Sequence, residues 1–124
     1  MIRLGTIVLG ADDVERAVEF WSSALGYDIV RFSGSDNGFT ILRPPSGEGT
    51  RVAIQLAETP VQEHPRVHLD LVVEDAAEQA AEIHRLIGLG ATRVAWASYP
   101  DDPDFVVLAD PEGNRFCVVD AAHG

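Results

Sequence analysis

The chain has 124 residues, of which 46% are hydrophobic, and a mean hydropathy of +0.04, so its composition is that of a soluble globular domain and not of a disordered chain. Its formal net charge of −11 argues against nucleic acid as a partner, because a phosphate backbone attracts clusters of Lys and Arg. The single cysteine, Cys117, excludes an internal disulfide framework and favours a reducing compartment.

The first half of the chain predicts a strand, a helix and three more strands. The apolar run that ends at Asp12 is too short for a signal peptide or a membrane span, so we expect a cytoplasmic protein and no membrane partner. Asp13 predicts the start of a helix and Gly26 its end. The predicted strands are 4–11, 27–32, 39–43 and 51–56, the segment 33–38 is a predicted hairpin turn, and the helix carries an apolar stripe of Val14, Val18, Trp21 and Leu25.

The second half repeats the first with an offset of 62 residues. Under this offset Ile7 aligns with Leu69, Asp13 with Asp75, and Gly26 with Gly88. The predicted strands are 67–73, 92–97, 105–109 and 115–120, and the predicted helix begins at Asp75, ends at Gly88 and carries a stripe of Ala76, Ala80, Ile83 and Ile87. Asp12 with Glu15, and Asp75 with Glu78, have the three-residue spacing of a capping box.

This duplication predicts an α+β fold. Two tandem βαβββ modules, 1–60 and 65–124, would form one domain that covers residues 1–124. Their strands would make a cupped, mostly antiparallel sheet of eight strands. A half-open cup of this kind is a usual place for a small ligand.

Three motifs, in order, resemble the vicinal-oxygen-chelate superfamily of glyoxalases, bleomycin-resistance proteins and dioxygenases. They are the segment 9–26 with Asp13, Phe20-Trp21 and Leu25-Gly26; the segment His68-Leu69-Asp70-Leu71 with Asp75 and Leu89-Gly90-Ala91; and Asp110-Pro111-Glu112-Gly113-Asn114 followed by Arg115-Phe116-Cys117. The resemblance implies a glyoxalase-like fold. It also implies lyase, isomerase, dioxygenase or thiol-transferase chemistry, or antibiotic binding without catalysis, in a cup completed by a homodimer.

The resemblance also implies where a divalent metal would bind. The four ligand positions of the family fall here on Thr6, Ala53 (or Gln55), His68 and Cys117. Thr6 and Ala53 are unsuitable ligands and Gln55 is a poor one, whereas His68 and Cys117 alone would not hold a metal tightly. Asp70 shares the face of His68 but lies about 7 Å along the strand. We therefore expect no metal and no other cofactor.

The remaining candidates are residues that can line the cup. His68 can donate or accept a proton, as a catalytic residue, or can serve structure through a bond to Asp70. Cys117 is a nucleophile if a neighbour stabilises its thiolate, and otherwise a small buried residue. The expected ligand-binding residues are Thr6, Gln55, His68, Asp70, Trp96, Tyr99 and Cys117, with the two aromatic residues stacking on a planar ligand. His64, His84 and His123 have no partner pattern and are expected at the surface, and the arginines are scattered.

The sequence thus favours a protein that binds a small organic molecule, such as a metabolite or an antibiotic, without the usual metal. One alternative is a metal-dependent lyase, isomerase or dioxygenase with an altered ligand set. Another is a metal-free acid–base enzyme that uses His68. A regulatory module that kept the fold but lost the binding cup is the third.

Overall fold

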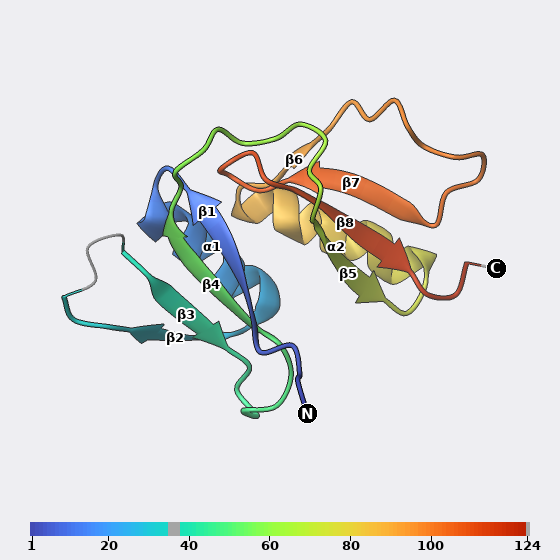
Figure 1. Ribbon diagram of the computed structural model, residues 1–124. Coiled ribbons are helices and arrows are strands. Elements are labelled where there is room, and N and C mark those ends of the chain that lie inside the picture. Colours follow the sequence, from blue (N-terminus) through green and yellow to red (C-terminus); the bar gives the residue numbers. More distant parts are fainter. Residues whose placement is uncertain (35–37, 124) are drawn as a thin grey trace. The chain divides into compact units, whose positions relative to one another are not determined.

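The computed structural model describes residues 1–34 and 38–123, and the chain divides into two compact units, Met1–Pro60 and Val61–Gly124 (Figure 1). Each unit contains four strands and one helix in the order β-α-β-β-β, so the predicted α+β fold with two βαβββ modules is confirmed. The elements are β1 (Thr6–Ala11), α1 (Val14–Leu25), β2 (Asp28–Arg31), β3 (Thr40–Arg43), β4 (Arg51–Leu56), β5 (Leu69–Val73), α2 (Ala76–Leu89), β6 (Thr92–Arg93), β7 (Phe105–Ala109) and β8 (Arg115–Asp120). The predicted turn at 33–38 includes residues 35–37, which lie outside the described residues.

The first module is a four-stranded mixed sheet with the strand order β1-β4-β3-β2. β1 is parallel to β4, and the other neighbours are antiparallel. Helix α1 packs on this sheet and buries Val18 and Trp21, each 1% exposed, as well as Ala17 and Phe20. Trp21 is therefore a core residue, as its position in the helical stripe predicts.

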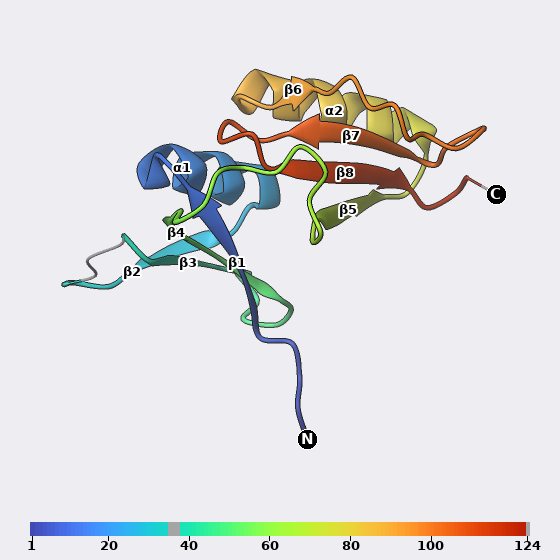
Figure 2. The ribbon, with the colours of Figure 1, turned by 45° about the horizontal axis from the view of Figure 1, so that its top comes forward.

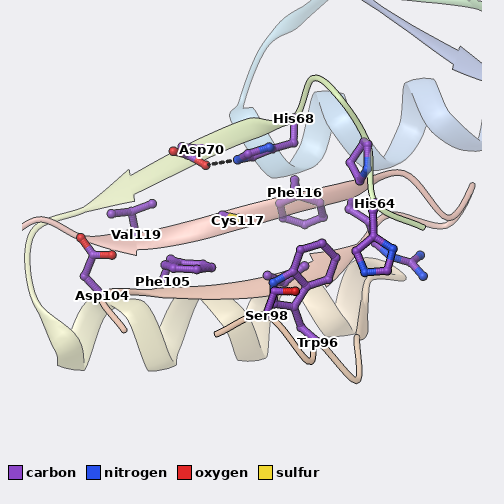
Figure 3. Close-up of a pocket in the computed structure, with 13 residues that line it drawn as sticks. His64, His68, Asp70, Trp96, Ser98, Asp104, Phe105, Phe116, Cys117 and Val119 are labelled. Carbon is purple, nitrogen blue, oxygen red and sulfur yellow. Dashed lines mark ion pairs between the residues drawn. The ribbon is translucent and has the colours of Figure 1, made fainter. Parts of the chain in front are cut away.

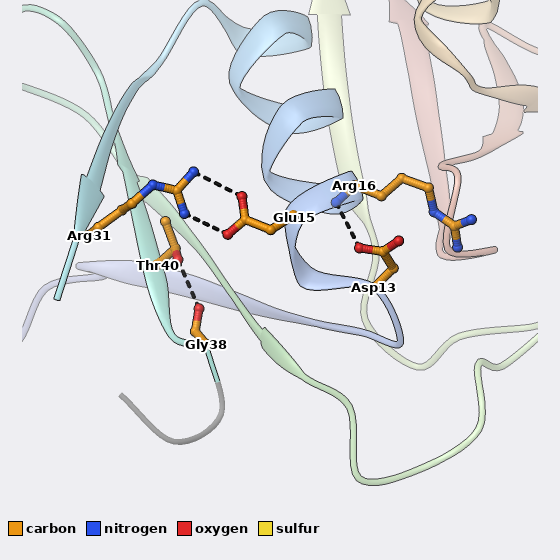
Figure 4. A network of polar contacts seen from close by, with 6 residues as sticks. All are labelled: Asp13, Glu15, Arg16, Arg31, Gly38 and Thr40. Atoms are coloured by element: carbon orange, nitrogen blue, oxygen red, sulfur yellow. Dashed lines mark hydrogen bonds and ion pairs between the residues drawn. The ribbon is translucent and has the colours of Figure 1, made fainter. Parts of the chain in front are cut away.

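The start of α1 is set by Asp13, whose carboxylate accepts the backbone N–H of Arg16 at 3.1 Å (Figure 4). Gly26 ends the helix with a φ of 68°, so both predicted caps are confirmed. The capping box predicted for Asp12 and Glu15 is wrong, because the residue that caps α1 is Asp13, one residue after Asp12. Glu15 instead forms a bidentate ion pair with Arg31, at 2.7 and 3.0 Å, which links α1 to β2.

The second module repeats this arrangement with the strand order β5-β8-β7-β6 (Figure 2). β5 is parallel to β8, and the other neighbours are antiparallel. Asp75 caps α2 by accepting the N–H of Glu78 at 2.8 Å, and the Glu78 carboxylate accepts the N–H of Glu74 at 3.2 Å. In a capping box the Glu78 carboxylate would accept the N–H of the cap residue, Asp75. Here it accepts the N–H of the preceding residue, Glu74.

Three boundaries of the second module differ from the prediction, and the first is the start of β5 at Leu69 instead of residue 67. Helix α2 ends at Leu89 and is capped by Gly90, with a φ of 125°, so the predicted stop at Gly88 is wrong. In this helix Ile83 and Leu86 are buried and Ile87 is 37% exposed, so Leu86 takes the place that the predicted stripe gave to Ile87. Strand β6 is also shorter than predicted, because only Thr92 and Arg93 pair with β7.

Neither helix of the described residues combines the length and the apolar character needed to cross a bilayer.

Candidate functional site

One cavity of about 430 Å³ lies entirely within the second module (Figure 3). Strand pairing places Val107 of β7 and Asp70 of β5 on either side of Cys117 of β8, so all three side chains share one face of the sheet. The lining consists of His64, Pro65, His68, Asp70, Trp96, Ser98, Asp104, Phe105, Val107, Arg115, Phe116, Cys117 and Val119. Apolar side chains from β7 and β8 thus make much of this surface, and the polar side chains that complete it are His64, His68, Asp70, Ser98, Asp104 and Arg115.

The sheet brings three of the predicted site residues into one cluster. The Nε2 atom of His68 lies 3.1 Å from Oδ1 of Asp70, and Cys117 hydrogen-bonds to the same carboxylate. The potential ligand atoms of these three residues lie within 4.8 Å of one another. The backbone separation of about 7 Å between His68 and Asp70 therefore does not keep the two side chains apart. The histidine and the carboxylate are each about half exposed.

The environment of Cys117 holds its side chain in the thiol form. Burial is the largest cause that raises the pKa of Cys117 from 9.0 to about 11, and the Asp70 carboxylate contributes to this rise through its charge and by accepting the thiol hydrogen bond. The residue is 7% exposed. Cys117 is therefore protonated at neutral pH. It is not a nucleophile with a stabilised thiolate, which was the first of the two roles considered for it from the sequence.

The aromatic candidates have different positions. Trp96 lines the cavity, and its ring lies 4.8 Å from that of His64, with 36° between the planes. Tyr99 is not among the lining residues. Its hydroxyl accepts the backbone N–H of Val107 at 2.7 Å, and its ring packs 5.3 Å from Phe105. Tyr99 thus contacts two residues of the cavity wall without lining the cavity itself, whereas Trp96 is available to a ligand.

The other two predicted ligand-binding residues belong to the first module. Thr6 pairs with Arg51 and Gln55 pairs with Gly10 across β1 and β4, which puts both on the sheet face that carries Ala53. The donors there are a hydroxyl and an amide, and Ala53 has none. This set does not suit a divalent metal. His68, Asp70 and Cys117 of the second module could hold a metal, but the first module adds no strong ligand, so the family's four-ligand arrangement does not fit this chain.

His64 and Arg115 are among the lining residues that the sequence analysis did not predict. His64 lies in the irregular segment 57–68, where no periodicity indicates a direction for its side chain. His64 is exposed, as predicted, but it does have a partner, since its ring lies against that of Trp96. Arg115 lies two residues before Cys117 on β8, so strand alternation was an available signal for placing it on the same face.

Comparison with known proteins agrees with this geometry. A family model described as "Glyoxalase-like domain" matches residues 6–119. A glyoxalase-related enzyme from Fulvimarina pelagi is 19% identical, with a TM-score of 0.69 over 100% of this chain and 96% of that one. A glyoxalase/bleomycin resistance protein/dioxygenase family enzyme from Burkholderia phytofirmans is 15% identical, with a TM-score of 0.72 over 96% and 98%.

A fosfomycin resistance protein from Listeria monocytogenes is a further structural neighbour. It is 14% identical, with a TM-score of 0.67 over 96% of this chain and 89% of that one. Among curated proteins no significant match was found. At these identities the structural likeness shows the fold.

Proposed function

Because the chain belongs to the glyoxalase-like family, we propose that it binds a small organic molecule in the cavity of its second module, without the usual metal of related enzymes. The observation that carries this proposal is the cavity itself. Its volume of about 430 Å³ suits a small ligand, and its walls combine apolar side chains with the cluster of His68, Asp70 and Cys117 and with further polar groups, among them Asp104 and Arg115. We also propose that the protein forms a homodimer and is located in the cytoplasm.

A ligand screen is the direct experiment. The melting temperature is measured against collections of metabolites and antibiotics, and a ligand at 100 times its dissociation constant is expected to add about 2.7 kcal/mol to the free energy of unfolding. Trp96→Ala should weaken binding of a planar hit about tenfold, because the stacking surface is lost. Phe32→Ala is the matched control, since Phe32 is a half-exposed aromatic residue of the first module.

The outcomes of the screen separate the alternatives. Equal losses of affinity in Trp96→Ala and Phe32→Ala would place the ligand elsewhere. The absence of any stabilising compound in broad collections would favour a regulatory module that has lost ligand binding.

A metal-free acid–base enzyme is the second candidate, and the contact between His68 and Asp70 favours it. A carboxylate at 3.1 Å orients the imidazole, as general acid–base catalysis requires. A hit from the screen is incubated with the protein, and products are followed by mass spectrometry. Turnover that disappears in His68→Gln, while binding persists, would support catalysis. A compound that binds and is recovered unchanged favours the binding protein.

Metal content is a separate prediction. Protein purified without chelator should carry well below one equivalent of Zn, Ni, Fe or Mn, because Thr6, Ala53 and Gln55 supply no strong ligand. Elemental analysis measures this directly. About one ion per chain, lost in His68→Ala, would contradict the metal-free proposal.

A further inference from the structure

A second, smaller cavity adjoins the proposed binding cavity. It has a volume of about 300 Å³ and also lies within the second module. Three residues, His64, Trp96 and Arg115, line both cavities. Of these three residues, Arg115 carries a permanent charge. Because it lines both cavities, a ligand in the larger cavity that extends toward the smaller one would meet it.

The guanidinium of Arg115 has an unused donor. Its Nη1 donates to the backbone carbonyl of Gly113 at 2.9 Å. Its Nε is buried and is the one buried side-chain nitrogen or oxygen without a hydrogen-bond partner within residues 1–34 and 38–123. Over the same residues, no carboxylate forms an ion pair with Arg115. A charged donor that is shielded from water and lacks an acceptor is costly, and an incoming oxygen would relieve that cost.

The order of side chains along the sheet gives this cavity two unlike ends. Leu69 pairs with Phe116 in parallel register, so one step earlier His68 lies level with Arg115. At the other end Val119 pairs with Phe105, and Asp104 comes next. Asp70 lies between the two ends, but its carboxylate is already engaged by His68 and by the thiol of Cys117. The guanidinium of Arg115 therefore lies at one end of the cavity, and Asp104 lies at the opposite end.

We propose that Arg115 binds the carboxylate of an organic acid whose apolar body lies against Trp96 and Val107. This inference rests on the proposed function and names the ligand class for the same cavity. A carboxylate supplies the acceptor that the guanidinium lacks, in a charge-assisted hydrogen bond. The net charge of −11 would favour a cationic ligand at long range, but the contacts inside the cavity select the charge of the group that is bound.

A matched set of probes tests this assignment. Indole-3-acetate, indole-3-acetamide and tryptamine present a carboxylate, a neutral amide and an ammonium group on the same ring, and 2-naphthylacetate, its amide and 2-naphthylethylamine form a second set. Calorimetric titration should give the acetates about tenfold or more tighter binding than either relative. Arg115→Gln should reduce acetate affinity by about tenfold to a hundredfold and change amide affinity less than about twofold. Arg66→Gln removes the same charge from an exposed position outside both cavities and serves as the control.

The results distinguish this inference from the proposed function. If the amide or the amine binds as tightly as the acetate, or if Arg115→Gln leaves acetate affinity unchanged, the carboxylate site is wrong while ligand binding in the cavity stands. If no member of either set binds, the carboxylate site is contradicted, whereas ligand binding in the cavity is decided by the broad screen of melting temperatures. Arg115→Lys keeps the charge without the planar donors and should fall between the wild type and Arg115→Gln, so it also tests the site if the glutamine variant is unstable.

Discussion

Native Cys117 is expected to react with iodoacetamide at pH 8 about 100-fold or more slowly than the same cysteine in an unstructured peptide of residues 112–121. The thiolate is the reacting species, and a pKa of about 11 in place of 9.0 lowers its share by two powers of ten. Burial of the side chain also hinders access of iodoacetamide to the sulfur. Alkylation is followed by intact mass, and the rate should keep rising with pH toward 11.

Removing the neighbouring charge separates the causes of this shift. Asp70→Asn removes the charge that opposes the thiolate, so Cys117 should react about threefold to tenfold faster at pH 8. Asp104→Asn removes the same charge farther along the cavity and should leave the rate unchanged. A native rate like that of the peptide, with an inflection near pH 9, would contradict the assigned environment.

The same pKa shift links folding to pH. Between about pH 9 and about pH 11 the folded protein holds a proton on Cys117 that the unfolded chain has lost. The stability that this proton contributes is complete below pH 9, and the free energy of unfolding falls as the pH rises through this window. Under neutral conditions a metal would have to displace that proton before the sulfur could bind it. Cys117 is therefore better suited to a hydrogen bond within the cavity wall than to nucleophilic or metal chemistry.

The fold is largely predictable from local patterns, but the error at the end of α2 has its cause in tertiary contacts. Asp13, Gly26 and Asp75 each act through bonds within a single helical turn, so residue type and spacing are enough to assign them. Gly88 and Gly90 are equally able to follow a helix, and the choice between them depends on where α2 meets the next strand. That information lies in tertiary contacts.

The candidate site is predictable only where regular structure sets its geometry. Strand alternation puts His68 and Asp70 on one face, and the pairing of β5 with β8 then brings Cys117 to them. No such rule applies to His64, because the segment that carries it is irregular. The role of Tyr99 also depends on a hydroxyl contact with Val107, eight residues away, which residue type alone does not indicate.

Asp110→Ala is expected to lower the free energy of unfolding by about 2 to 4 kcal/mol. Asp110 is 2% exposed, and its Oδ1 accepts the backbone N–H groups of Glu112 and Asn114, both at 2.9 Å. Its Oδ2 accepts the side-chain amide of Asn114 at 3.3 Å. Alanine would leave these donors without their acceptor in a turn that is shielded from water. Urea denaturation at pH 7, followed by tryptophan fluorescence, measures the loss.

Asp110→Asn is the matched variant, because its amide oxygen can still accept the two backbone N–H groups. It should cost about 1 kcal/mol, which reflects the weaker acceptor and the altered contact with Asn114. An alanine variant within about 0.5 kcal/mol of the wild type would contradict the role assigned to the carboxylate. Since this turn leads directly into Arg115 and Cys117, ligand affinity should fall in the alanine variant even where it is folded, and should recover in Asp110→Asn. The acidic sequence Asp110-Pro111-Glu112-Gly113-Asn114 thus acts on the cavity through the direction it gives to β8, without contact with the ligand.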